Sequence, residues 1–154
     1  MSKLKVALPF ALLFLVAACS SIHFASVFVI GTDDEQVRNE ITELVKSSVE
    51  ARGGQCRLST NPTSRWFCSL QDREIQSIFV GIDGTGDFTV GISSVGGTFF
   101  PPSRKAIQNE TYLPKGLVQT EMWVLELLEG YPVEEAFRLH DGIENVIQLK
   151  EESK

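Results

Sequence analysis

Cysteine and histidine are the residue types in this chain with the most varied chemistry, and their positions limit what that chemistry is. The 154 residues include three cysteines, Cys19, Cys56 and Cys68, and two widely separated histidines, His23 and His140. A structural zinc site usually takes four thiolate or imidazole ligands in closely spaced pairs, and no second pair accompanies Cys56 and Cys68. The pattern therefore predicts no metal site and leaves a disulfide as the chemistry of that pair.

The register of a predicted hairpin would place Cys56 and Cys68 close enough to form the disulfide. If residues 61–63 form a loop, Leu58 opposes Trp66 and Cys56 opposes Cys68. Directly opposed residues of an antiparallel ladder lie about 4.5 to 5.5 Å apart at Cα, which a disulfide tolerates. Closing a loop of this size stabilises a fold by about 3 kcal/mol on the chain-entropy estimate.

Three polar residues alternate like the first ligands of a calcium-binding loop: Asp83, Thr85 and Asp87. The rest of that motif is missing, because its glycine position holds Phe88 and its final glutamate position holds Ser94. A glycine-rich hairpin turn explains the same residues. We therefore expect a turn here, with no bound cation.

His140 and Asp141 are the one adjacent histidine and carboxylate in the sequence. Adjacent residues on a helix point about 100° apart and do not form an oriented dyad. The predicted mature chain, residues 19–154, has no G-x-S-x-G or S-x-x-K motif and no phosphate or dinucleotide fingerprint. It predicts no catalytic residue and no cofactor.

The N-terminal residues have the three regions of an export signal. Met1 to Lys5 carries two lysines, Val6 to Val16 is apolar apart from Pro9, and small residues precede Cys19. The stretch Val16-Ala17-Ala18-Cys19 resembles the lipobox of bacterial lipoproteins, although leucine is commoner where Val16 stands. The resemblance covers about the first 20 residues. It implies that residues 1–18 are a signal peptide and that Cys19 carries a diacylglycerol and becomes the new amino terminus.

The lipoprotein resemblance also implies a location. Two or three acyl chains hold a protein firmly on a membrane, and Ser20, in place of an aspartate after the cysteine, favours the periplasmic face of the outer membrane. Lipidation of Cys19 leaves the other two cysteines as an even pair in an oxidising compartment. The alternative is an uncleaved helix within Val6 to Ile30, a stretch without formal charge.

The net charge of the mature chain limits the classes of partner that it can bind. Removing Lys3 and Lys5 leaves 12 of the 14 basic residues against 20 acidic ones, a formal net charge of −8. Such a surface repels phosphate backbones and anionic headgroups, so we expect no nucleic-acid binding and no electrostatic docking on a membrane.

The first elements after the lipobox are a strand over His23–Ile30 and a helix that begins near Thr32. Thr32 and Glu35 form a capping-box pattern, and apolar residues at helical spacing follow as far as Val49. Gly53 and Gly54 end the helix.

A second hairpin joins 75–82 to 88–94 and pairs Ile82 with Phe88. Helices are predicted at 117–129 and 132–140, with 143–149 open to either helix or strand. These elements predict one α+β domain over 19–154, in which helices cover one face of an antiparallel meander of about four strands.

Two aromatic residues beside two prolines, Phe99-Phe100-Pro101-Pro102, are our candidate partner contact, because prolines end a strand and leave the rings available. The alternative is that both rings fold back over the sheet. Two functional classes remain for the domain. We expect a non-catalytic accessory lipoprotein that binds a membrane-proximal envelope protein; the alternative is a small enzyme or ligand-binding protein whose site is assembled from distant residues.

Overall fold

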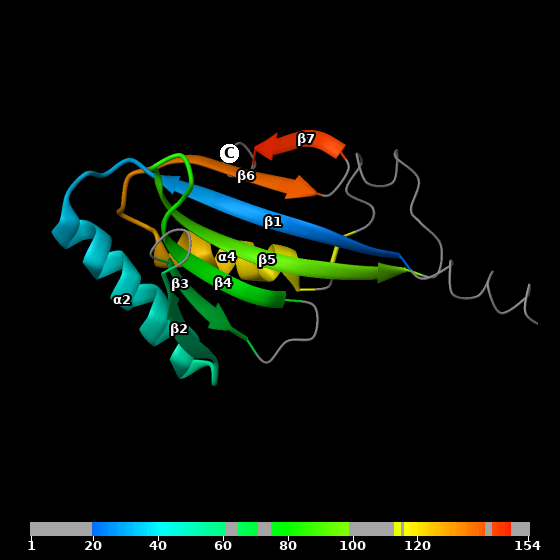
Figure 1. Ribbon diagram of the computed structural model, residues 1–154, viewed down its shortest axis with the longest axis horizontal. Coiled ribbons are helices and arrows are strands. Elements are labelled where there is room, and N and C mark those ends of the chain that lie inside the picture. Colours follow the sequence, from blue (N-terminus) through cyan, green and yellow to red (C-terminus); the bar gives the residue numbers. More distant parts are fainter. Residues whose placement is uncertain are drawn as a thin grey trace, which may run out of the picture.

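The computed structural model describes residues 20–60, 65–70, 75–98, 113–114, 116–140 and 143–148, which form nine elements (Figure 1). In chain order these are β1 (Ser20–Ile30), α2 (Glu35–Ala51), β2 (Gln55–Ser59), β3 (Arg65–Ser69), β4 (Ile75–Ile82), β5 (Phe88–Thr98), α4 (Leu117–Leu127), β6 (Val133–His140) and β7 (Ile143–Gln148). They confirm the predicted α+β class with a single antiparallel sheet.

The described residues form a sheet of seven strands in the order β2-β3-β4-β5-β1-β6-β7, so the expected count of about four is wrong. Strands β2 to β5 form the expected meander. The first strand lies between β5 and β6 and is antiparallel to both. The final hairpin, β6 and β7, extends the sheet beyond β1.

The predicted third helix at 132–140 is wrong, because Val133–His140 is strand β6. The apolar residues of this segment, including Val133, Ala136 and Phe137, suit helical spacing as well as a strand. Pairing decides the outcome: Phe137 lies opposite Val27 of β1, and the ladder satisfies an edge that β1 otherwise leaves open. The segment that the sequence left undecided is strand β7, Ile143–Gln148.

Helix α2 begins two residues later than a Thr32 cap requires, so the capping-box prediction is wrong. Asp34 is the N-cap, and its side chain accepts a hydrogen bond from the Gln36 N–H at 2.8 Å. Thr32 Oγ1 instead accepts from the Asp34 N–H at 3.2 Å. The chain leaves the helix through Gly53, whose φ of 80° suits glycine.

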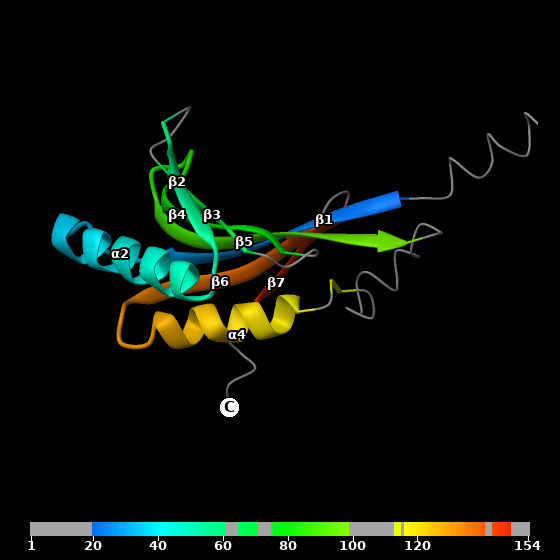
Figure 2. The same cartoon turned by 90° about the horizontal axis from the view of Figure 1, so that it is seen from below.

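Both helices pack against the same face of the sheet. Helix α2 covers β2, β3 and β4, and α4 lies against β5; Figure 2 shows α4 running beneath the strands. Alternate strand residues enter the core that this face forms: Phe24, Phe28, Ile78, Val80, Val90 and Ile92. The second hairpin has the predicted register, in which Ile82 faces Phe88, Val80 faces Val90 and Ile78 faces Ile92.

Helix α2 contributes the stripe of Ile41, Val45 and Val49 to the same core. Its C-terminal end meets the second helix, where the Arg52 guanidinium lies 3.8 Å from the centroid of the Trp123 ring. The other face of the sheet, which we call the open face, carries no helix among the described residues. None of the helices in this part of the chain combines the length and apolar character needed to cross a bilayer.

Candidate functional site

The residues predicted to contact the membrane and a partner lie outside the described residues. These are the signal peptide 1–18, Cys19, and the aromatic pair Phe99 and Phe100. Strand β1 begins at Ser20, directly after the predicted lipid attachment position, and β5 ends at Thr98, directly before the aromatic pair.

The predicted disulfide is confirmed. Cys56 on β2 lies directly opposite Cys68 on β3, with Leu58 opposite Trp66, as the hairpin register predicts. The two sulfur atoms are bonded, and the Cα atoms are 4.0 Å apart. The bond fastens the edge of the sheet beneath α2, whose Lys46 ammonium lies 3.9 Å from the centroid of the Trp66 ring.

The open face has a row of residues that crosses six strands and was not predicted as a site. Successive cross-strand pairs place these residues side by side: Arg57, Phe67, Phe79, Gly91, Val27 and Phe137. We call this set the open-face row. Alternate residues of the second hairpin are small or polar, with Phe79 the large exception, but only the pairing of distant strands shows which residues form the row.

The aromatic part of the open-face row is tightly arranged. The Phe67 and Phe79 ring centroids are 6.3 Å apart at an interplanar angle of 43°. A Cβ added at Gly91 would overlap the Phe79 ring, so that ring lies across the glycine. The Arg65 guanidinium stands 5.1 Å from the Phe79 centroid, and its Nε donates to the Ile82 carbonyl at 3.0 Å.

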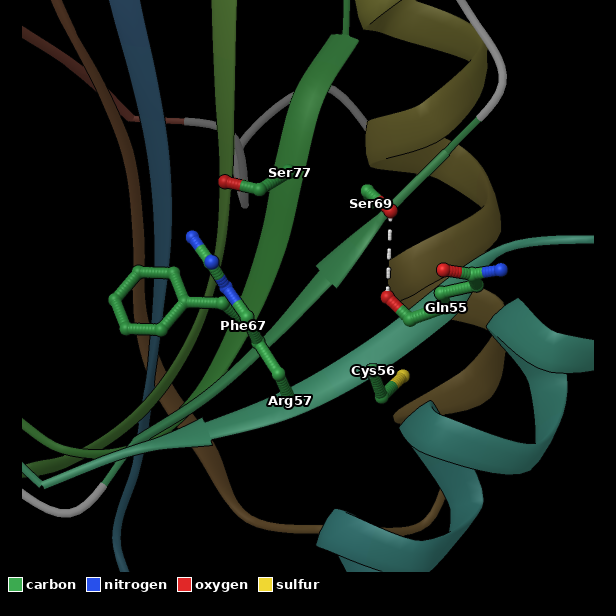
Figure 3. Close-up of a pocket in the computed structure, with 6 residues that line it drawn as sticks. All are labelled: Gln55, Cys56, Arg57, Phe67, Ser69 and Ser77. Atoms are coloured by element: carbon green, nitrogen blue, oxygen red, sulfur yellow. Dashed lines mark hydrogen bonds between the residues drawn. The ribbon is translucent and has the colours of Figure 1, made fainter.

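A hollow of about 410 Å³ opens beside this row, over β2, β3 and β4. It is lined by Gln55, Cys56, Arg57, Phe67, Ser69 and Ser77. Figure 3 shows the Arg57 side chain passing Phe67 with its guanidinium toward Ser77. Ser69 Oγ donates to the Gln55 carbonyl at 3.3 Å. A guanidinium, hydroxyl groups and an aromatic ring are suited to binding a carboxylate that belongs to a partly apolar ligand.

A second hollow of about 290 Å³ lies where the chain enters α2 and is lined mainly by polar groups. Its one basic residue is Arg38, whose Nη2 lies 3.0 Å from Asp33 Oδ1. Arg38 Nε also donates to the Thr32 carbonyl at 2.9 Å. These contacts hold the loop before the helix and leave this guanidinium already occupied.

In the turn that begins at Asp83, the polar groups form hydrogen bonds with one another. Asp83 Oδ1 accepts from the Thr85 N–H at 2.8 Å, the Thr85 hydroxyl at 2.5 Å and the Asp87 N–H at 3.1 Å. Burial raises the pKa of Asp83, but the hydrogen bonds from Thr85 and Asp87 and the charge of Arg65 together outweigh it, and the pKa lies below its ordinary value. These contacts give the alternating acids a structural role. Within the described ranges, no group of three or more His, Cys, Asp or Glu residues is placed to hold a metal ion.

A buried polar cluster joins α4 to the sheet, and it was not predicted from the residue pattern. Arg138 Nε donates to Glu121 Oε1 at 2.7 Å, and a second bond joins Arg138 Nη2 to Glu121 Oε2. Ser26 Oγ donates to the same carboxylate at 2.5 Å. All three side chains are buried, so the cluster holds α4 against strands β1 and β6.

The two histidines lie away from these features. His23 is exposed on β1, and His140 is the last residue of β6, opposite Phe24. His23 lines neither hollow. The expected helix that ends in His140 is therefore replaced by a strand end, and Asp141 lies outside the described residues.

Comparisons with known proteins give no match: no family model, no curated protein and no solved structure matches the chain.

Proposed function

We propose that the chain is an exported bacterial lipoprotein, cleaved after residue 18 and anchored through a lipid on Cys19 to the periplasmic face of the outer membrane. The Cys56–Cys68 disulfide is the observation that carries the proposal, because such bonds persist in oxidising compartments. With those two cysteines paired, Cys19 is the remaining cysteine, and it stands at the end of the lipobox.

The position of β1 supports a lipid anchor over an uncleaved transmembrane helix. Residues 20–30 belong to the central part of the sheet, so an apolar helix that begins at Val6 has only residues 6–19 for its length. These 14 residues are fewer than the roughly 20 that a transmembrane helix needs. The same closeness of Cys19 to β1 leaves no linker and supports a membrane-proximal partner.

The activity that we propose is non-catalytic binding of an envelope protein. One observation supports it: the open face has three half-buried aromatic residues, Phe67, Phe79 and Phe137. Apolar surface that stays partly exposed on a sheet face is suited to an interaction site. A small enzyme or ligand-binding protein is the alternative, and the hollow beside Arg57 is where its ligand would bind.

Processing of the precursor tests the proposed cleavage and lipid anchor. Mass spectrometry of the membrane fraction should find the mature chain acylated at Cys19, and Cys19→Ala should abolish both acylation and cleavage. The matched control is the double variant Cys56→Ala/Cys68→Ala, which should still be acylated. A full-length chain with an unmodified Cys19 in the membrane fraction would show that the anchor is the uncleaved helix.

Binding through the open face is tested by photo-crosslinking in intact cells. A photoreactive residue at position 67, on the open face, should yield adducts with an envelope protein. The control position is Gln119, which is exposed on α4. Equal adducts from both positions, or none from position 67, would contradict binding through this face.

A further inference from the structure

Strand β2 is the outermost described strand of the sheet beside the hollow, and no described strand lies along its outer edge. Cys56 and Cys68 are 4.0 Å apart at Cα, the short separation typical of a pair that exchanges no backbone hydrogen bonds. Hydrogen bonding alternates along an antiparallel ladder, so Arg57 bonds to β3 through its backbone while the N–H and C=O groups of Cys56 and Leu58 point away from it. No described strand pairs with those outward groups.

The side chains of β2 present two different surfaces at this edge. Leu58 is 50% exposed on the helix-bearing side. Arg57 is exposed on the open face and lines the hollow. An added strand would therefore meet an apolar position and a basic position in alternation.

Arg57 differs from the other arginines in the described part of the chain. Arg38 and Arg138 form ion pairs, Arg65 bonds to a carbonyl and Arg52 stacks on Trp123. The Arg57 side chain forms no ion pair with a described residue. No described carboxylate balances its charge, although the formal net charge of the chain is −6.

The positive charge of Arg57 determines which kind of strand can pair with the outer edge of β2. A second copy of β2, added antiparallel about its central residue, would place Arg57 against Arg57, and like charges directly opposed are destabilising. A segment with an acidic residue at that position would form a charge-assisted pair instead. Charge complementarity therefore favours a different chain over self-association.

We propose that β2 binds an extended segment of a partner protein by strand addition, with a glutamate of the segment opposite Arg57 and an apolar residue opposite Leu58. The proposal rests on the proposed binding function and names the chemistry of its partner. The backbone of the segment bonds to Cys56 and Leu58, which provides affinity without regard to sequence. The glutamate enters the hollow and binds the Arg57 guanidinium, which provides specificity.

A peptide titration tests the charge requirement. The membrane-anchored protein as it is isolated from cells, purified in detergent with its disulfide intact, is titrated with a fluorescein-labelled peptide of alternating valine and glutamate. A second titration uses the same peptide carrying lysine for glutamate. Fluorescence anisotropy should show binding to the glutamate peptide at least tenfold tighter. Arg57→Glu should weaken that binding at least tenfold and reverse the preference. The control Arg52→Glu changes the net charge equally and should leave the dissociation constant within twofold.

A backbone variant tests strand addition itself. Leu58→Pro removes the outward N–H, and proline is tolerated on an edge strand where its N–H would face solvent. The variant should lose at least tenfold in affinity while its circular dichroism and disulfide stay unchanged, whereas Leu58→Ala, which keeps the N–H, should lose less. Binding that needs Arg57 but is unchanged by Leu58→Pro would overturn strand addition in favour of anion binding by side chains.

Three further results would overturn the proposal. These are equal binding of the two peptides, no binding of either, and displacement of the glutamate peptide by phosphatidylglycerol vesicles in an Arg57-dependent manner, which would assign the site to a lipid headgroup. The test is independent of the anchor. If a correctly acylated protein does not bind the peptide, only this inference is contradicted. If a protein that is not acylated at Cys19 binds the peptide, only the proposed lipid anchor is contradicted.

Discussion

The carboxylate of Glu121 on α4 faces the guanidinium of Arg138 on β6, and both side chains are almost completely buried. Arg138 donates two hydrogen bonds in the side-by-side geometry that suits a carboxylate. Ser26 of the neighbouring strand donates to the same group, so one acid fixes α4 against the central strands of the sheet. Burying two charges is costly, and the pair stabilises the fold only while it is complete.

We expect Glu121→Ala to lower the free energy of unfolding by about 3 to 5 kcal/mol, because it removes the buried carboxylate that pairs with the Arg138 charge. Urea denaturation measures the loss. The control Glu126→Ala removes an exposed acid from the same helix and should change stability by less than about 0.5 kcal/mol. The double variant Glu121→Leu/Arg138→Met should recover most of the loss, and a double variant as unstable as Glu121→Ala would contradict the buried-charge explanation.

A neighbouring serine should respond in the opposite direction. Ser94 Oγ is buried and has no hydrogen-bond partner among the described residues. A buried hydroxyl without a partner costs about 1 to 3 kcal/mol, so Ser94→Ala should leave stability unchanged or raise it by about 1 kcal/mol. Ser26→Ala, which removes a bonded hydroxyl, should lower it. Thermal melts of the two variants side by side would settle the matter, and a clear loss for Ser94→Ala would reveal a partner for its hydroxyl.

The turn before β5 should make stability depend on pH. The pKa of Asp83 is lower in the folded chain than its ordinary value, so its ionised form stabilises the fold above the unfolded-state pKa, and this contribution is lost as the pH falls through the folded pKa. Asp83→Asn should therefore lower stability at pH 7 by about 1 kcal/mol, the net contribution of a typical hydrogen bond. The difference from wild type should shrink below about pH 4. A constant difference from pH 7 to pH 3, measured by urea denaturation, would contradict the role of the charge.

The sequence predicted the two hairpins well because their registers depend on local information. Cross-strand pairing of Cys56 with Cys68 and of Val80 with Val90 follows from loop length and from residue types that lie close in the chain. The α2 stripe was predictable for the same reason. Its cap was misplaced by two residues, because Thr32 and Asp34 are both competent N-caps and only the geometry of the entering loop selects Asp34.

Strand β6 and the open-face row depend on long-range pairing, which the sequence does not reveal. Phe137 is in a strand because β1 lies beside it, although more than a hundred residues separate it from Val27. Arg57 and Phe79 belong to one row only when β2, β3 and β4 are in register. Nothing in the local sequence pattern shows that Glu121 and Arg138 meet between a helix and the sheet.

Gly91 and Phe79 provide the most direct test of the open-face row. A methyl group at Gly91 would occupy the space of the Phe79 ring, so Gly91→Ala should displace the ring and lower stability by about 1 to 3 kcal/mol. The control Gly84→Ala places a methyl group where no atom lies within 4 Å and should be nearly neutral. In the background of Phe79→Ala, where the ring is absent, Gly91→Ala should cost much less. A double-mutant cycle by urea denaturation measures this coupling, and additive effects of the two substitutions would show that the ring does not rest on the glycine.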